Sequence, residues 1–421
     1  MRRHPLLPLG YLACAAVAFL LAAMGSVWLA SDMAGHYYHP RLLALTHLVT
    51  LGWITVAIMG ASYQLVPVVL ERPIWSERLA GWQLAVMAVA VAGMVSHFAL
   101  GTGLGLASAA GLLAVGIALH LLNVGLTFRR VTRWTFTARL ILLGHGGLTL
   151  TTLFGVTLAF NRVWRFLPDD FFPILHAHLL LALFGWVAPM VLGVSARIYP
   201  MFLLTPEPSL TVSRVQLWSL TLGVPSVVLG VMDRPPLLAL GGFALALTAG
   251  SHAASILNMV RGRKRPQLDW SFRFVVTATA FLLPAAVVGL GLAVNFLAGP
   301  RPALAFAVLL LGGWISLTIV GMMLKIVPFL VWSRVYGPRA GREPVPTLAQ
   351  LCWPRAESLA YALLVSGIGL LGATVWLGDV VWIRGAGAVV ALGALAFATA
   401  LARILGHLRS GGVVHVEAHA R

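Results

Sequence analysis

RLLALTHLVTLGWITVAIMGASYQLVPVVL, residues 41–70, is the stretch that decides how this chain folds. It is apolar over a membrane-spanning length and carries one imidazole, His47, near its start. A frame of the form G-W-x6-G-x6-P follows this histidine. The frame occurs three times, at Gly52-Trp53 to Pro67, Gly185-Trp186 to Pro200 and Gly313-Trp314 to Pro328. Its near-equal spacing predicts three versions of one four-helix unit. The unit boundaries fall at about 1–134, 135–266 and 267–421.

The composition indicates an integral membrane protein. Of 421 residues, 60% are hydrophobic and only 10% are charged, and the mean hydropathy is +0.92. This leaves too little polar surface for a soluble globule, so we expect one all-α, polytopic membrane domain over residues 1–421, with the lipid bilayer as its partner. The net charge of +17 comes from basic residues scattered over short loops, which argues against nucleic-acid binding. Cys14 and Cys352 are isolated, so neither a redox dithiol nor covalently attached c-type haem is encoded.

Twelve segments are long enough to cross a bilayer. They are expected at about 9–31, 41–70, 79–101, 104–128, 136–160, 172–203, 212–232, 236–260, 272–298, 303–333, 355–378 and 382–408. The positive charges set the orientation, because placing the N-terminus in the cytoplasm puts most Arg and Lys residues on the inside. We therefore expect a bacterial-type cytoplasmic (inner) membrane protein with both termini in the cytoplasm. His47 then lies in the outer half of the second span, about 9 Å below its start.

The histidines offer the chemistry in this sequence. An imidazole inside a span suggests function, although a neutral ring bonded to a backbone carbonyl is the structural alternative. Their expected depths sort them into an outer set of His36, His39, His47, His97, His176 and His178, and an inner set of His120, His145 and His252. In the inner set, His120 and Arg129 recur at the same spacing as His252 and Arg261. This recurrence indicates either a second haem site or a polar contact repeated with the unit.

The motif H-x4-G-W-x6-G-A-x-Y-x-L-V-P, which begins at His47, resembles the haem-bearing tenth helix of the catalytic subunit of C-type haem-copper oxidases. A similar opening occurs in NnrS-type haem proteins, which are linked to nitric oxide stress. The resemblance implies twelve transmembrane helices in three pseudo-repeated arcs of four. In that family the second histidine of an H-x-H pair is an axial ligand of the low-spin haem. His47 stands in that register, whereas His178 stands in the register of the first histidine.

The family's copper-site histidines are absent. The seventh expected span contains no histidine, and neither does the tenth. The resemblance therefore implies a divergent relative that lacks the haem-copper centre. What remains is haem b in the outer half, held by His47 and His178 from different helices.

Other outer histidines have less defined roles. His97 is the reserve axial ligand for either position. His176 lies two residues before His178 and points about 200° away on a helix, so it would serve a different neighbour. His36 and His39 lie at the outer surface and could bind copper, contact the propionates of the haem or have no ligand.

Two classes of function fit these features. The first is electron transfer, or a redox role linked to nitric oxide or respiration, with a cytochrome or a quinone as electron donor. The second is a transporter, or a copper- or cofactor-handling protein without haem, since internal repeats and prolines within spans suit transport. The twelve carboxylates all fall in loops or at span ends, which disfavours both proton-coupled transport and a pumping oxidase.

Overall fold

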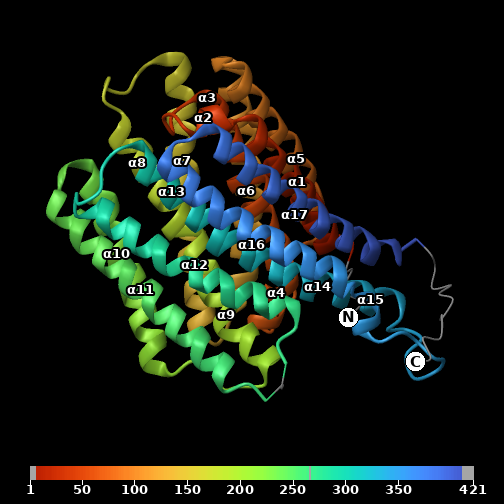
Figure 1. The fold of residues 1–421 in the computed structure, drawn as a ribbon. Coiled ribbons are helices and arrows are strands. Elements are labelled where there is room, and N and C mark those ends of the chain that lie inside the picture. Colours follow the sequence, from red (N-terminus) through yellow and green to blue (C-terminus); the bar gives the residue numbers. More distant parts are fainter. Residues whose placement is uncertain (1–5, 265–266, 410–421) are drawn as a thin grey trace.

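The computed structural model describes residues 6–264 and 267–409, which form a bundle of long helices (Figure 1). Twelve helical spans in these residues are long and apolar enough to cross a membrane, and no strand is present among them. The chain is therefore an all-α, multi-pass membrane protein, as the composition predicts. The spans are Leu6–Trp28 (α1), Pro40–Val69 (α3, η1, α4), Glu77–Leu100 (α5), Gly103–Phe128 (α6), Phe136–Trp164 (α7), Phe172–Leu203 (α8, η2, α9), Leu210–Asp233 (α10), Pro235–Arg261 (α11), Trp270–Ala293 (α12), Pro300–Val335 (α13, η3, α14), Pro354–Leu377 (α16) and Val380–Gly406 (α17).

The span boundaries differ from the sequence expectations by a few residues and have local causes. Several helices begin at a capping side chain that accepts a backbone N–H of the first turn, as Ser76 does for α5 and Asp269 for α12. Helix α5 ends at Gly101, whose φ of 70° is the left-handed conformation that favours glycine. The ninth span ends at Ala293 and not near residue 298, because Asn295 takes a positive φ of 57° and turns the chain.

Three spans occupy the centre of the bundle. The most apolar windows of Pro40–Val69, Phe172–Leu203 and Pro300–Val335 are 61%, 72% and 61% buried, against at most 50% in any other span. Each central span contains a π-helix over its Gly-Trp pair: η1 (Leu48–Thr55), η2 (Leu181–Val187) and η3 (Val308–Ser316). Such wider turns within α-helices occur frequently at functional sites.

Buried tryptophans link the central spans. The indole N–H of Trp53 donates to Ser316 Oγ at 2.9 Å, and that of Trp186 donates to Thr55 Oγ1 at 3.4 Å. Ser316 lies two residues after Trp314, and Thr55 lies two residues after Trp53, so both acceptors hold the same position in the repeated frame. The equivalent position after Trp186 is Ala188, which has no hydroxyl group.

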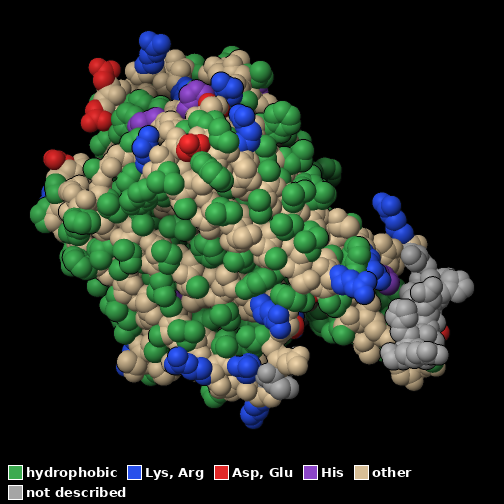
Figure 2. All heavy atoms as spheres, viewed as in Figure 1, with side chains coloured by type: hydrophobic (Ala, Val, Ile, Leu, Met, Phe, Trp, Pro, Cys, Tyr) green, Lys and Arg blue, Asp and Glu red, His purple; other side chains and the backbone are tan. Residues whose placement is uncertain are grey.

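The surface matches a bilayer environment. In Figure 2, the charged side chains gather at the two ends of the molecule, and the band between them is mainly hydrophobic or uncharged. Large apolar side chains in the spans are exposed, including Leu100, Leu222 and Val287. Helix α1 begins and α17 ends at the same end of the bundle (Figure 1).

Candidate cofactor site

A cavity opens among the second to sixth spans. Its empty volume is about 1080 Å³, with the open solvent at its mouth included. The lining comes from α3 (Pro40–His47), η1, α5, α6, α7, α8 (Phe172–Leu180) and η2, with Tyr38 just before α3 and Leu311 of η3 added. Most of the lining side chains are aliphatic or aromatic. The cavity therefore suits a mainly apolar ligand.

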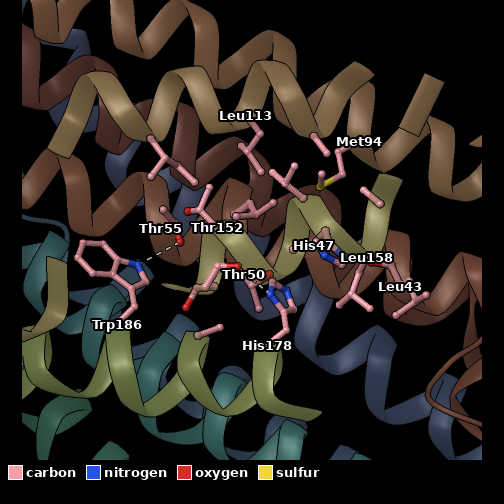
Figure 3. Close-up of a pocket in the computed structure, with 18 of the residues that line it drawn as sticks. Leu43, His47, Thr50, Thr55, Met94, Leu113, Thr152, Leu158, His178 and Trp186 are labelled. Carbon is pink, nitrogen blue, oxygen red and sulfur yellow. Dashed lines mark hydrogen bonds between the residues drawn. The ribbon is translucent and has the colours of Figure 1, made fainter. Parts of the chain in front are cut away.

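His47 and His178 both line this cavity from different spans, as Figure 3 shows. The Nδ1 atom of His47 lies 2.7 Å from the carbonyl oxygen of Leu43, one turn earlier in the same helix. The Nδ1 atom of His178 lies 3.0 Å from the carbonyl oxygen of Thr151 in α7. A carbonyl oxygen can only accept, so both Nδ1 atoms carry the proton. In the neutral rings, each Nε2 atom then has a free lone pair.

The rings of both histidines are held by close packing. The ring of Phe98 stacks on that of His47, with centroids 4.7 Å apart and planes 27° from parallel. Gly155 lies against His178. A Cβ atom added to this glycine would lie only 2.8 Å from His178 Cε1. Glycine at this position therefore allows the imidazole to lie against α7. Both contacts limit the freedom of the rings before any ligand binds.

One cation and one phenol line the cavity together. Arg162 Nη2 donates to Tyr38 Oη at 3.3 Å, and its guanidinium carbon lies 5.5 Å from the centre of the Tyr38 ring and 5.8 Å from that of Phe98. Among the described residues, no carboxylate forms an ion pair with Arg162. The arginine is exposed, and its charge is available to an acidic group on a ligand.

The threonines of the wall add little polarity. The hydroxyls of Thr50, Thr151 and Thr152 each donate to a backbone carbonyl one turn earlier in their own helix. Thr55 accepts from Trp186, which closes one part of the wall. These groups are thus already bonded, and the cavity wall between the histidines and Trp186 behaves as an apolar surface.

The other predicted outer histidines do not line the cavity. His97 lies near the end of α5, where its Nδ1 pairs with Thr102 Oγ1 at 2.7 Å. His176 Nε2 lies 3.0 Å from the hydroxyl of Tyr37. Burial raises the pKa of Tyr37, so the phenol keeps its proton. Both histidines therefore have polar partners outside the cavity.

The two histidines considered for copper lie at the same end of the bundle. His36 stacks on Tyr37 with ring centroids 4.3 Å apart, and His39 Nδ1 lies 2.9 Å from Asp32 Oδ1. They share a surface hollow with Asp32. Within residues 6–264 and 267–409, however, no three His, Cys, Asp or Glu side chains are grouped so as to hold a metal ion.

The sequence alone did not identify Arg162, Tyr38 or Gly155 as site residues. Gly155, Ala159 and Arg162 follow the i, i+4, i+7 spacing of a single helix face, and all three line the cavity. That spacing was a usable signal, but it could not show which of the neighbouring helices leaves a space in front of this face.

No protein-family model matches this chain, and no curated protein matches it either.

Proposed function

We propose that this chain binds a b-type haem between His47 and His178 and serves as a membrane-embedded electron carrier. One observation carries the proposal: two imidazoles from separate spans line one apolar cavity, each with Nδ1–H bonded to a backbone carbonyl. That hydrogen bond fixes the tautomer in which Nε2 is a metal ligand, as is usual for metal-binding histidines.

The remaining lining fits the same cofactor. A haem supplies four of the six iron ligands itself and one-electron redox chemistry when bound, so the protein needs only axial imidazoles and an apolar slot. The macrocycle carries two carboxylates, for which Arg162 and Tyr38 offer a guanidinium and a hydroxyl group. His47 and His178 would take both axial positions. This favours electron transfer, with a cytochrome or a quinone as donor, over activation of a gaseous substrate.

The proposal includes a distant relationship to the catalytic subunit of haem-copper oxidases. Its support is the repeated Gly-Trp frame, which falls on a π-helix in each central span. Three pseudo-repeated arcs of four helices would account for this recurrence. We further propose that the chain lies in the bacterial cytoplasmic membrane with its termini inside, because the inside loops of that orientation hold most of the arginines.

The test is the absorption spectrum of the full chain purified in mild detergent. We expect a Soret band and sharp α and β bands on reduction, with haem b identified by its pyridine adduct. The variants His47→Ala and His178→Ala should each lose the low-spin spectrum. His97→Ala is the matched control and should keep it, because His97 lies outside the cavity. Wild-type protein without a Soret band, or an unchanged spectrum in both His47→Ala and His178→Ala, would contradict the proposal.

A further inference from the structure

A second pair of imidazoles lies behind Trp186, outside the cavity lining. His120 of α6 and His145 of α7 are 0% and 7% exposed. Their Nε2 atoms are 3.3 Å apart, and their ring centroids are 5.2 Å apart. The ring of Trp186 meets both imidazoles edge to face. Trp186 also lines the cavity, so one indole separates the two histidine pairs.

The proton positions on the far side of each ring follow from its hydrogen bonds. His145 Nδ1 lies 2.7 Å from the carbonyl oxygen of Ile141, which can only accept, so this nitrogen carries a proton. His120 Nδ1 lies 3.1 Å from the hydroxyl of Tyr63. Tyr63 donates its one proton to Gln83 Oε1, and the amide nitrogen of Gln83 donates to the sulfur of Met59 at 3.0 Å. The Tyr63 oxygen is therefore left as an acceptor toward His120, whose Nδ1 must also carry a proton.

This network leaves two lone pairs facing each other. If Nδ1 is protonated in both neutral rings, both Nε2 atoms are unprotonated, and at 3.3 Å they repel unless an electrophile lies between them. Two imidazoles bound at about 2.0–2.1 Å to one ion would hold their nitrogens about 3.4 Å apart at a tetrahedral angle, which leaves two positions for other ligands, and about 4 Å apart in a linear arrangement. A single shared proton would draw charge-assisted partners closer, to about 2.7–2.9 Å. The observed separation is longer than a charge-assisted bond through one shared proton and close to that of two imidazoles bent around one ion, so the Nδ1 protons and the distance together favour an ion.

We propose that His120 and His145 bind one monovalent copper ion through their Nε2 atoms. Imidazole is a good copper ligand. The charge also favours a monovalent ion, because all the carboxylates of the chain fall in loops or at span ends and none is available here to balance a dication. Tyr63 and Ile141 act as positioning groups that fix both tautomers through Nδ1. The site uses none of the haem-binding residues proposed above, so copper binding can be tested independently of haem binding.

The chain contains a matched control for this site. His252 of α11 is also buried and meets Trp314 edge to face, with centroids 6.1 Å apart, much as His120 meets Trp186. No second imidazole contacts His252 among the described residues. A substitution at His252 therefore repeats the loss of a buried imidazole next to a central tryptophan without touching the proposed metal ligands.

The experiment measures metal bound to the full-length protein. Protein loaded anaerobically with Cu(I) is passed over a chelating resin, and its metal content is measured by mass spectrometry. We expect about one copper per chain in the wild type and in His252→Gln, and less than a tenth of that in His120→Gln and His145→Gln. Tyr63→Phe, which removes the acceptor for His120 Nδ1, should weaken copper binding about tenfold or more. The Soret band, measured in parallel, should not change in any of these variants.

Other outcomes overturn the proposal. Wild-type copper content no higher than that of His120→Gln would mean that the Gln83 amide is reversed, so that Tyr63 donates to His120 and the imidazoles share an ordinary N–H···N bond. Equal loss in His252→Gln would mean that the effect is structural. Stoichiometric zinc in place of copper would refute the monovalent ion. X-ray absorption at the copper edge of the wild type provides a test that needs no variant, and must show nitrogen ligands at about 2.0 Å.

Discussion

At the scale of single residues, His47 and His178 show how a hydrogen bond selects a chemical role. An imidazole with a free Nδ1 could have offered either nitrogen to a ligand. The carbonyls of Leu43 and Thr151 remove that choice and leave Nε2 as the acceptor in both rings. The same hydrogen bonds would also satisfy a purely structural histidine, so the cavity in front of the rings is what favours cofactor binding.

Gly155 provides a steric test of the His178 position. Gly155→Ala would place a methyl group 2.8 Å from His178 Cε1 and displace the imidazole, at an overpacking cost of about 1–3 kcal/mol. We expect haem occupancy, measured as the Soret-to-protein absorbance ratio, to fall about tenfold. Gly146→Ala in the same helix is the control, since an added Cβ there meets nothing within 4 Å. Equal occupancy in the two variants would remove His178 from the site.

Arg162 provides an electrostatic test of the cavity mouth. Arg162→Gln removes a cation that is exposed and screened, so the lost interaction with ligand carboxylates is about 0.2–1 kcal/mol. We expect haem to be released about two to five times faster to an excess of apomyoglobin. The midpoint potential should also fall, because a removed positive charge favours the oxidised iron. Arg162→Lys keeps the charge and should lie closer to the wild type. A release rate unaffected by either substitution would place the ligand's acidic groups elsewhere.

At the scale of elements, the three π-helices join the central spans into an incomplete ring of hydrogen bonds. Trp53 donates to Ser316 and Trp186 donates to Thr55, but the third position is Ala188. A hydrogen bond of this kind contributes about 0.5–1.5 kcal/mol of net stability. The incomplete ring therefore predicts that a hydroxyl group added at the buried residue 188 will stabilise the protein.

Ala188→Ser should raise the thermal unfolding midpoint in detergent if the three frames are equivalent, because the added hydroxyl would then be to Trp314 what Ser316 is to Trp53. Ser316→Ala should lower the midpoint, since it leaves the buried Trp53 indole N–H without its partner. Ser62→Ala is the comparison, because its hydroxyl bonds only to a carbonyl of its own helix. If Ala188→Ser destabilises the protein as much as Ser316→Ala does, the three positions are not equivalent.

The sequence predicted elements better than it predicted the directions of side chains. Apolar length placed all twelve spans, and the register of His47 and His178 relative to the Gly-Trp pairs selected the two histidines that share a cavity. The same reasoning kept His97 in reserve, because spacing could not show that its ring bonds to Thr102 beside the turn at Gly101. It also could not place Arg162, whose role depends on the space left between α6 and α7.

At the scale of the whole molecule, the orientation in the membrane can be tested directly. The proposed topology puts Asp169, in the loop before α8, outside and Ala340, in the loop after α14 (Leu317–Val335), inside. In a background without Cys14 and Cys352, a cysteine at residue 169 should react with a membrane-impermeant maleimide in intact cells. A cysteine at residue 340 should react only after the membrane is opened. The opposite labelling pattern would invert the topology and place the cavity in the inner half.

The cavity wall comes almost entirely from the first half of the chain, which the ribosome synthesises first. Apart from Leu311, every lining residue falls between Tyr38 and Val187, within the first six spans. Chains are synthesised from the N-terminus, so this wall is almost complete while the ribosome is still translating the second half of the chain. Capture of a cofactor by the nascent polypeptide is therefore sterically available, and the last six spans would then close over a site that is already loaded.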